Sequence, residues 1–212
     1  MKKFITFEGM DGSGKSTQIS LLKKSLKKIK EDFYFTREPG GTIFSEKIRR
    51  ILVQKMKENI QPKSELLLVY AARHQHVENI ILPNLRNQVV VCDRFYHSTF
   101  CYQIVPNKVR KELIDYLHKH FAENLLPDIT IFLDVKPKIS IKRSLKINTK
   151  ENRFELKNSE YHEKVYKAFK SFEKNKDFYL IDGSMNKKII HKQIVDILNK
   201  IKITKVPIPY FF

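Results

Sequence analysis

Short apolar runs alternate with longer amphipathic segments along most of the chain. Five runs are rich in Val, Ile, Phe and Tyr, and polar or turn-forming residues bound each of them. They span residues 4–8, 33–36, 89–93, 129–134 and 178–182. Because these runs do not alternate strictly between polar and apolar positions, they are typical of strands that are covered on both faces of a parallel sheet.

The segments between these runs repeat apolar residues at the three-to-four-residue spacing that favours helices. In the first of them Ile19, Leu22 and Leu26 fall on one stripe, and lysines lie opposite. The predicted helices span 16–29, 64–87, 109–121, 161–175 and 187–201. Alternation of strands with helices predicts an α/β fold, with a five-stranded parallel sheet flanked by helices.

Two stretches fit neither pattern. Residues 146–158 are polar and lie between helical segments, so we predict a mobile lid there. Residues 203–212 carry two prolines and several aromatics and form a tail to which the sequence assigns no role. A chain of 212 residues without repeats or linkers is expected to form a single domain over 1–212.

The net charge of +18 raises the question of a nucleic-acid surface. Nine of the 41 basic residues are arginines, and the lysines are scattered over the whole length. This distribution indicates a general drift toward lysine, so we expect no nucleic-acid partner. Absence of a long apolar segment or leader-like start predicts no membrane association and a cytoplasmic location. Cys92 and Cys101 are too few for a disulfide framework or a metal cluster.

A glycine-rich loop follows the first predicted strand and precedes the first predicted helix. Gly9 to Ser16 match the pattern G-x4-G-K-[ST] without exception. Glycines let successive backbone N–H groups converge on one point, and the following helix adds the positive end of its dipole. Lys15 and Ser16 suit the distal phosphates and Mg²⁺ of a bound nucleotide. The loop therefore predicts a nucleoside triphosphate site.

A second anion site is predicted where other strands end. The segments 36–42 and 93–103 each follow a strand directly, and parallel strands expose their carboxyl ends at one edge. Four of the few arginines, namely Arg37, Arg49, Arg73 and Arg94, lie in or near these segments and one long helix. Arginine in a lysine-rich chain indicates a need for its planar fork. Two phosphate sites and a lid indicate a phosphoryl transferase that acts on a phosphorylated acceptor.

The combined motifs resemble the bacterial type of thymidylate kinase. The resemblance covers nearly the whole chain, from "FITFEGMDGSGKSTQ" through "TREPGGT", "DRFYHST" and "LPDITIFLDV" to "NRFE" and "YHEKV". It implies the P-loop nucleoside monophosphate kinase fold and transfer of the γ-phosphate of ATP to dTMP, giving dTDP, with Mg²⁺ as cofactor. It also implies a homodimer.

The resemblance implies an acceptor site for dTMP. Its residues are Asp11, Glu38, Arg49, Val69, Arg73, Arg94, Ser98, Tyr102 and Gln103. Arg49 and Arg94 would grip the acceptor phosphate. Arg73 would hydrogen-bond the thymine edge, and Tyr102 would crowd the sugar 2′ position. Val69 stands where the family usually has a phenylalanine that stacks on thymine, so we expect looser base selection, which Val69→Phe should tighten.

The resemblance also implies the donor site and the catalytic groups. The ATP-binding residues would be Gly9, Met10, Asp11, Gly12, Ser13, Gly14, Lys15, Ser16, Thr17 and Arg143, the metal-binding residues Ser16 and Asp93, and the catalytic residues Lys15, Arg153, Asp11 and Arg94. Positions 10–13 of the loop hold no basic residue. In the family that the chain resembles, the cation for the transferring group lies either in this loop or in the lid, so the resemblance implies that Arg153, in the predicted lid, supplies it. It also implies that Arg143 stacks on adenine.

Other functions compete with this interpretation. Another nucleoside monophosphate kinase would share the loop and the arginines. A deoxynucleoside kinase would place a carboxylate base near a 5′-hydroxyl and would not need Arg49 and Arg94 on a phosphate. A basic ATP-binding protein that engages nucleic acid would show steep salt dependence of DNA binding.

Overall fold

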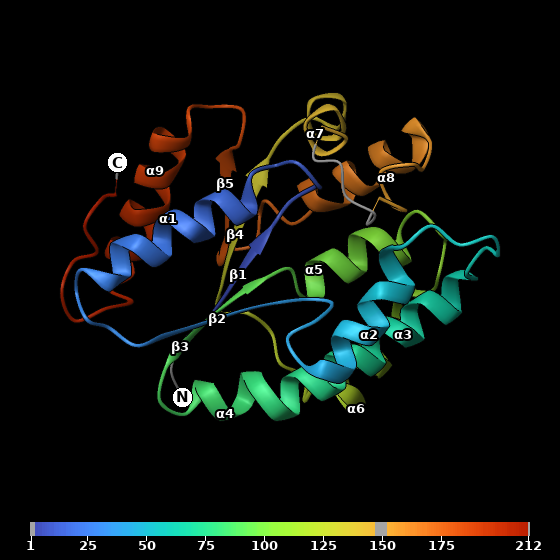
Figure 1. Ribbon diagram of the computed structural model, residues 1–212, viewed down its shortest axis with the longest axis horizontal. Helices are drawn as coiled ribbons and strands as arrows, with labels where there is room; N and C mark the ends of the chain where they lie inside the picture. Colours follow the sequence, from blue (N-terminus) through green and yellow to red (C-terminus); the bar gives the residue numbers. More distant parts are fainter. Residues whose placement is uncertain (1–2, 147–151, 212) are drawn as a thin grey trace.

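The computed structural model in Figure 1 describes residues 3–146 and 152–211. Within these ranges five strands form one parallel sheet in the order β2-β3-β1-β4-β5. The strands are β1 (Phe4–Glu8), β2 (Phe33–Arg37), β3 (Val89–Asp93), β4 (Ile129–Asp134) and β5 (Phe178–Asp182). The predicted fold class and all five strand positions are confirmed.

Helices connect the strands and cover both faces of the sheet. The α-helices are α1 (Lys15–Lys27), α2 (Ile43–Val53), α3 (Pro62–His76), α4 (Leu82–Leu85), α5 (Tyr96–Thr99), α6 (Lys111–Phe121), α7 (Pro137–Ser144), α8 (Ser159–Lys170) and α9 (Lys187–Lys200). Two π-helical turns, η1 (Val77–Ile81) and η2 (Phe100–Ile104), continue α3 and α5. The long helix predicted over 64–87 is thus α3, η1 and α4 in succession.

Three helices were not predicted: α2, α5 with η2, and α7. A local signal exists for α2, since the Thr42 side chain accepts a hydrogen bond from the Ser45 backbone N–H as an N-cap. The other two are short, and they begin soon after the ends of β3 and β4. Tertiary contacts decide such segments more than propensity does.

Alternate side chains along the strands point to opposite faces of the sheet and form two separate apolar layers. Ile5, Phe7, Val91 and Ile131 pack toward α1 and α9, while Phe4, Val90 and Cys92 pack toward α3, α4 and α6. Figure 1 shows the first pair of helices on one side of the sheet and the second group on the other. Burial on both faces explains why the central strands β1, β3 and β4 are apolar at nearly every position.

The segment after α9 folds back onto the body of the protein. The Asn199 side chain bonds both the N–H and the carbonyl of Ile208, and the Tyr210 hydroxyl donates to Asp196. The Phe211 ring lies beneath the ammonium groups of Lys24 and Lys28. The tail therefore fastens α9 to α1. None of the helices in the described ranges has the length and apolarity needed to cross a membrane.

Candidate active site

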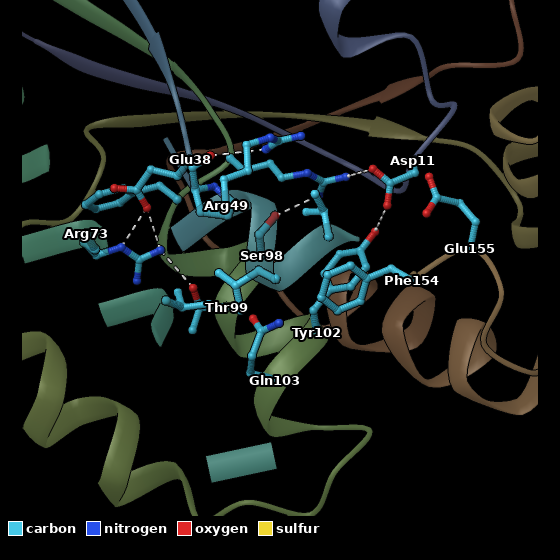
Figure 2. Close-up of a pocket in the computed structure, with 16 residues that line it drawn as sticks. Asp11, Glu38, Arg49, Arg73, Ser98, Thr99, Tyr102, Gln103, Phe154 and Glu155 are labelled. Atoms are coloured by element: carbon cyan, nitrogen blue, oxygen red, sulfur yellow. Dashed lines mark hydrogen bonds and ion pairs between the residues drawn. The ribbon is translucent and has the colours of Figure 1, made fainter. Parts of the chain in front are cut away.

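Two adjoining cavities open at the carboxyl edge of the sheet. The inner cavity lies between α2, α3 and the segment that follows β3, and the loop cavity lies over the glycine-rich loop. Both are lined by Asp11, Glu38, Arg49, Arg94 and Glu155. Figure 2 shows the inner cavity, with Glu38 and Arg73 at one end and Asp11, Tyr102 and Phe154 at the other. A molecule in one cavity therefore faces a molecule in the other across a shared wall.

The loop around Gly12 wraps the start of α1. Gly12 has φ of +81°, and a Cβ there would lie 2.2 Å from the carbonyl oxygen of Ser140 in α7. Ser140 in turn donates from its hydroxyl to the Asp11 carbonyl. Glycine is thus required both for the backbone angle and for the close approach of α7. This packing holds the loop in a shape that presents its N–H groups to an anion.

Lys15 lies inside the loop that it serves. Its ammonium group donates to the carbonyls of Gly9 and Met10, at 2.9 and 3.0 Å, and its side chain is buried. Burial lowers the pKa of Lys15, and the positive charge of Arg94 lowers it further. An anionic phosphate in the loop cavity would relieve both effects, because it supplies the opposite charge that these carbonyls provide only in part.

Arg94 sits at the junction of the two cavities in a strained backbone conformation. Its φ is +70°, which is uncommon for a residue with a side chain. The guanidinium donates to the Asp11 carboxylate at 2.6 Å and to the Ser98 hydroxyl at 2.9 Å. Asp11 also accepts from the Tyr102 hydroxyl. The loop and the segment after β3 are thereby joined through one cation.

Glu8, at the end of β1, holds the segment that follows β3 in place, although the sequence does not predict it as a site residue. Its fully buried carboxylate accepts hydrogen bonds from the Ser98 hydroxyl and from the backbone N–H groups of Phe95 and Ser98. Burial raises the pKa of Glu8 to about 6, although these bonds oppose the rise. A carboxyl with a raised pKa favours the fold most when it is protonated, so its contribution to stability falls as the pH rises through about 6.

The far end of the inner cavity holds a buried ion pair. The Arg73 Nε atom donates to Glu38 at 2.8 Å, and its Nη2 atom donates to the Thr99 hydroxyl at 2.8 Å. His76 also hydrogen-bonds Glu38, at 3.0 Å. Among the described residues the buried Nη1 atom of Arg73 has no partner. Arg73 therefore offers a fixed donor at the cavity wall.

The side of the inner cavity is apolar and includes a ring from outside the predicted set. Val69 and Phe154 both line it, and Phe154 packs against the cluster of α2 and α3 side chains that contains Val69. Gln103, which also lines the cavity, donates to buried Glu65 at 2.9 Å. Glu65 and Phe154 were both missed, because their pairings join segments far apart in the chain.

Arg153 lines neither cavity. Its Nε atom donates to the Leu52 carbonyl and its Nη2 atom to Glu65, both at 2.5 Å. Arg143 does line the loop cavity, where it donates to the Gly183 carbonyl at 3.0 Å. The predicted lid lies partly outside the described residues, which omit 147–151.

The expected metal-binding residues meet in the loop cavity. Ser16 and Asp93 both line it, and among the described residues the buried Oδ1 atom of Asp93 has no hydrogen-bond partner. A hydroxyl and a carboxylate oxygen suit Mg²⁺, which binds few protein groups and takes phosphate oxygens and waters as its other ligands. In the described ranges three or more His, Cys, Asp or Glu side chains nowhere gather around a possible ion.

Comparisons with known proteins agree with this geometry. The family model described as thymidylate kinase matches residues 7–194. The chain belongs to the thymidylate kinase family. It is 45% identical over 169 residues to the thymidylate kinase of Rickettsia canadensis, a match that covers 79% of this chain and 81% of the relative. It is 38% identical over 200 residues to the thymidylate kinase of Sulfurihydrogenibium sp., covering 93% and 97%.

Most residues that the thymidylate kinase resemblance implied lie on the cavity walls. All nine acceptor-site residues line the inner cavity, and residues 11–17 with Arg143 line the loop cavity. Gly9 and Met10 instead supply carbonyls to Lys15. The loop cavity also has walls that were not predicted, from Gln18, Gly183, Met185, Lys187 and Ile190. The roles of these residues in binding stay predictions.

Proposed function

We propose that this member of the thymidylate kinase family transfers the γ-phosphate of ATP to dTMP, giving dTDP. The observation that carries the proposal is the shared wall of the two cavities, where Arg94 and Asp11 face both. ATP would place its phosphates on the glycine-rich loop, and dTMP would lie in the inner cavity with its phosphate toward Arg94. The two phosphates would then meet in line, which is what direct transfer requires.

The side chains act mainly by position and charge. Lys15 would contact the distal phosphates of ATP, while Arg49 and Arg94 would bind the dTMP phosphate. Asp11 holds Arg94 in place through their 2.6 Å contact. A phosphate monoester is largely dianionic at neutral pH, so its oxygen can attack without a protein base. The protein thus supplies orientation and compensation of negative charge.

Ser16 and Asp93 would hold the Mg²⁺ that accompanies ATP. The ion would neutralise charge on the β- and γ-phosphates. The unpartnered Oδ1 atom of Asp93 supports this assignment, since a buried carboxylate oxygen without a donor is costly unless a cation satisfies it.

A substrate survey tests the proposal. The protein is incubated with ATP, Mg²⁺ and one acceptor from dTMP, dUMP, dCMP, dAMP, dGMP and thymidine, and nucleotides are separated by ion-exchange chromatography. We expect dTDP as the main product and no phosphorylation of thymidine. Phosphorylation of thymidine in preference to dTMP would make it a deoxynucleoside kinase. Lack of any product, with salt-sensitive DNA binding, would favour a nucleic-acid-binding ATPase.

We propose Arg153 as the cation that stabilises the transferring phosphoryl group. Its guanidinium would have to leave Glu65, which it binds in this structure, and contact that group instead. We expect Arg153→Ala to lower kcat by roughly a hundredfold or more, with the KM for dTMP changed by about threefold at most. The KM should change by no more than this because the variant keeps the backbone bond from position 153 to the Val53 carbonyl and the packing of Phe154 in its apolar clusters. Of the contacts of the ring it loses only the one with the guanidinium. A raised KM with unchanged kcat would show that Arg153 only anchors its segment on Glu65.

The exposed face of α2 and α3 supports a homodimer. Phe44 and Ile51 lie seven residues apart on α2 and so share a face, and Leu67 is exposed on the neighbouring α3. Apolar side chains gathered on one face mark an association surface. Light scattering should give twice the mass of one chain, and Leu67→Glu should shift the population toward monomer.

A further inference from the structure

Phe154 lines the inner cavity from the segment that follows α7, at the end opposite Arg73 (Figure 2). It packs against two separate apolar clusters, one from α2 and α3 that includes Val69 and one that includes Tyr102. Its ring centroid lies 5.6 Å from that of Tyr102, at an interplanar angle of 84°. Figure 2 shows the two rings beside each other at the Asp11 end of the cavity.

Three contacts hold Phe154 in this place. The backbone N–H of Arg153 donates to the Val53 carbonyl at 3.1 Å, at the end of α2. The guanidinium of Arg153 lies 4.5 Å from the centre of the Phe154 ring while it binds Glu65. Glu65 also accepts a hydrogen bond from Gln103. The same buried carboxylate therefore positions Gln103 directly and the Phe154 ring through Arg153.

The chemistry of the cavity indicates what this ring would contact. Leu52, Val53 and Val69 give aliphatic surface, whereas Arg73 and Gln103 give polar groups. A flat heterocycle with carbonyl and N–H edges suits such a cavity, and an aromatic surface binds its face better than valine does. Among the described residues three aromatic rings line the cavity, from Phe95, Tyr102 and Phe154. The Phe95 ring is fully buried and covered by the Arg73 guanidinium at 4.6 Å. The Tyr102 hydroxyl is engaged with Asp11, which leaves the Phe154 ring for the base.

On the basis of the proposed function, we infer that Phe154 is a specificity-determining residue for the acceptor base. Its ring supplies the aromatic contact that the α3 position Val69 lacks. With Phe154 in this role, we expect for Val69→Phe the opposite of what the sequence alone predicts. A second ring at position 69 would compete with Phe154 for the same cluster, so this variant should weaken acceptor binding.

Steady-state kinetics of Phe154→Ala and Phe154→Leu test the inference. We expect Phe154→Ala to raise the KM for dTMP by about tenfold, because stacking of a base on an aromatic ring contributes on that order. Phe154→Leu should lie between alanine and the unmodified protein, and the KM for ATP should change by about twofold at most. Leu156→Ala is the matched control, since Leu156 is exposed on the same segment and does not line the cavity.

A ligand without a base separates base contact from general damage to the site. Inhibition by 2-deoxyribose 5-phosphate depends on the sugar and phosphate contacts alone, so its inhibition constant should be unchanged in Phe154→Ala. Equal weakening of dTMP and of this compound would overturn the inference, because it would show that Phe154 only supports the site. An unchanged KM for dTMP in Phe154→Ala would overturn it as well.

A double variant tests the competition between the two positions. Val69→Phe with Phe154→Ala should bind dTMP more tightly than either single variant, since one ring then replaces the other. Additive weakening would contradict a shared base contact. If the unmodified protein made no dTDP at all, the proposed function would fail instead, so the two failures are distinct.

Discussion

Replacement of Arg94 by alanine should lower kcat/KM for dTMP on the order of 10³-fold, because it removes the cation at the wall between the two cavities. The side chain is mostly buried and bonds both Asp11 and Ser98. In its absence the Asp11 carboxylate would face the incoming phosphate without compensation, so repulsion would add to the lost attraction. Initial rates at varied dTMP and ATP measure the effect.

Two further variants make the interpretation of this experiment specific. Arg94→Lys keeps the charge but loses the planar fork that reaches Asp11 and Ser98 together, so we expect it to recover only a small part of the activity. Arg86→Ala removes an exposed arginine at the end of α4 and should leave the kinetics unchanged. Rates for Arg94→Ala close to those of Arg86→Ala would exclude Arg94 from the mechanism.

The sheet and the phosphate loop were predictable from the sequence because their signals are local. A strand buried on both faces shows itself as a short apolar run, and all five runs became strands. The loop from Gly9 to Ser16 is one continuous segment, so its sequence pattern alone predicts its backbone conformation. Glu8 lies one position before this loop and was counted only as the end of a strand. Its bonds to Phe95 and Ser98 depend on how β1 and β3 pair.

The walls of the inner cavity were predicted only where a family motif named their residues. The resemblance named Val69 and Arg73, and both line the cavity. Phe154 was missed as a wall residue because it reaches the cavity through backbone contact with the end of α2, a helix that was itself not predicted. The same contact explains why Arg153 lies against Glu65, away from the loop.

Replacement of Arg73 by methionine should cost the fold about 3–5 kcal/mol, because it leaves the buried Glu38 carboxylate without its main counter-ion. Burial alone would raise the pKa of Glu38, but Arg73 and His76 outweigh burial and hold this pKa below its ordinary value. In Arg73→Met that pKa should rise above the unfolded value. Ionised Glu38 then destabilises the fold at neutral pH, and the deficit should shrink as the pH falls toward about 4.5. Urea unfolding at several pH values measures it.

A second substitution separates the two roles of Arg73. In Arg73→Met with Glu38→Gln the buried charge is gone, so stability at neutral pH should recover in large part, since an uncharged pair can replace a buried ion pair at little cost. Binding of dTMP should not recover, because the Nη1 donor that has no partner among the described residues is still absent. Calorimetric titration with dTMP measures this second effect. A double variant no more stable than Arg73→Met would show that packing, and not the unpaired carboxylate, caused the loss. Restored dTMP affinity would show that Arg73 serves the fold alone.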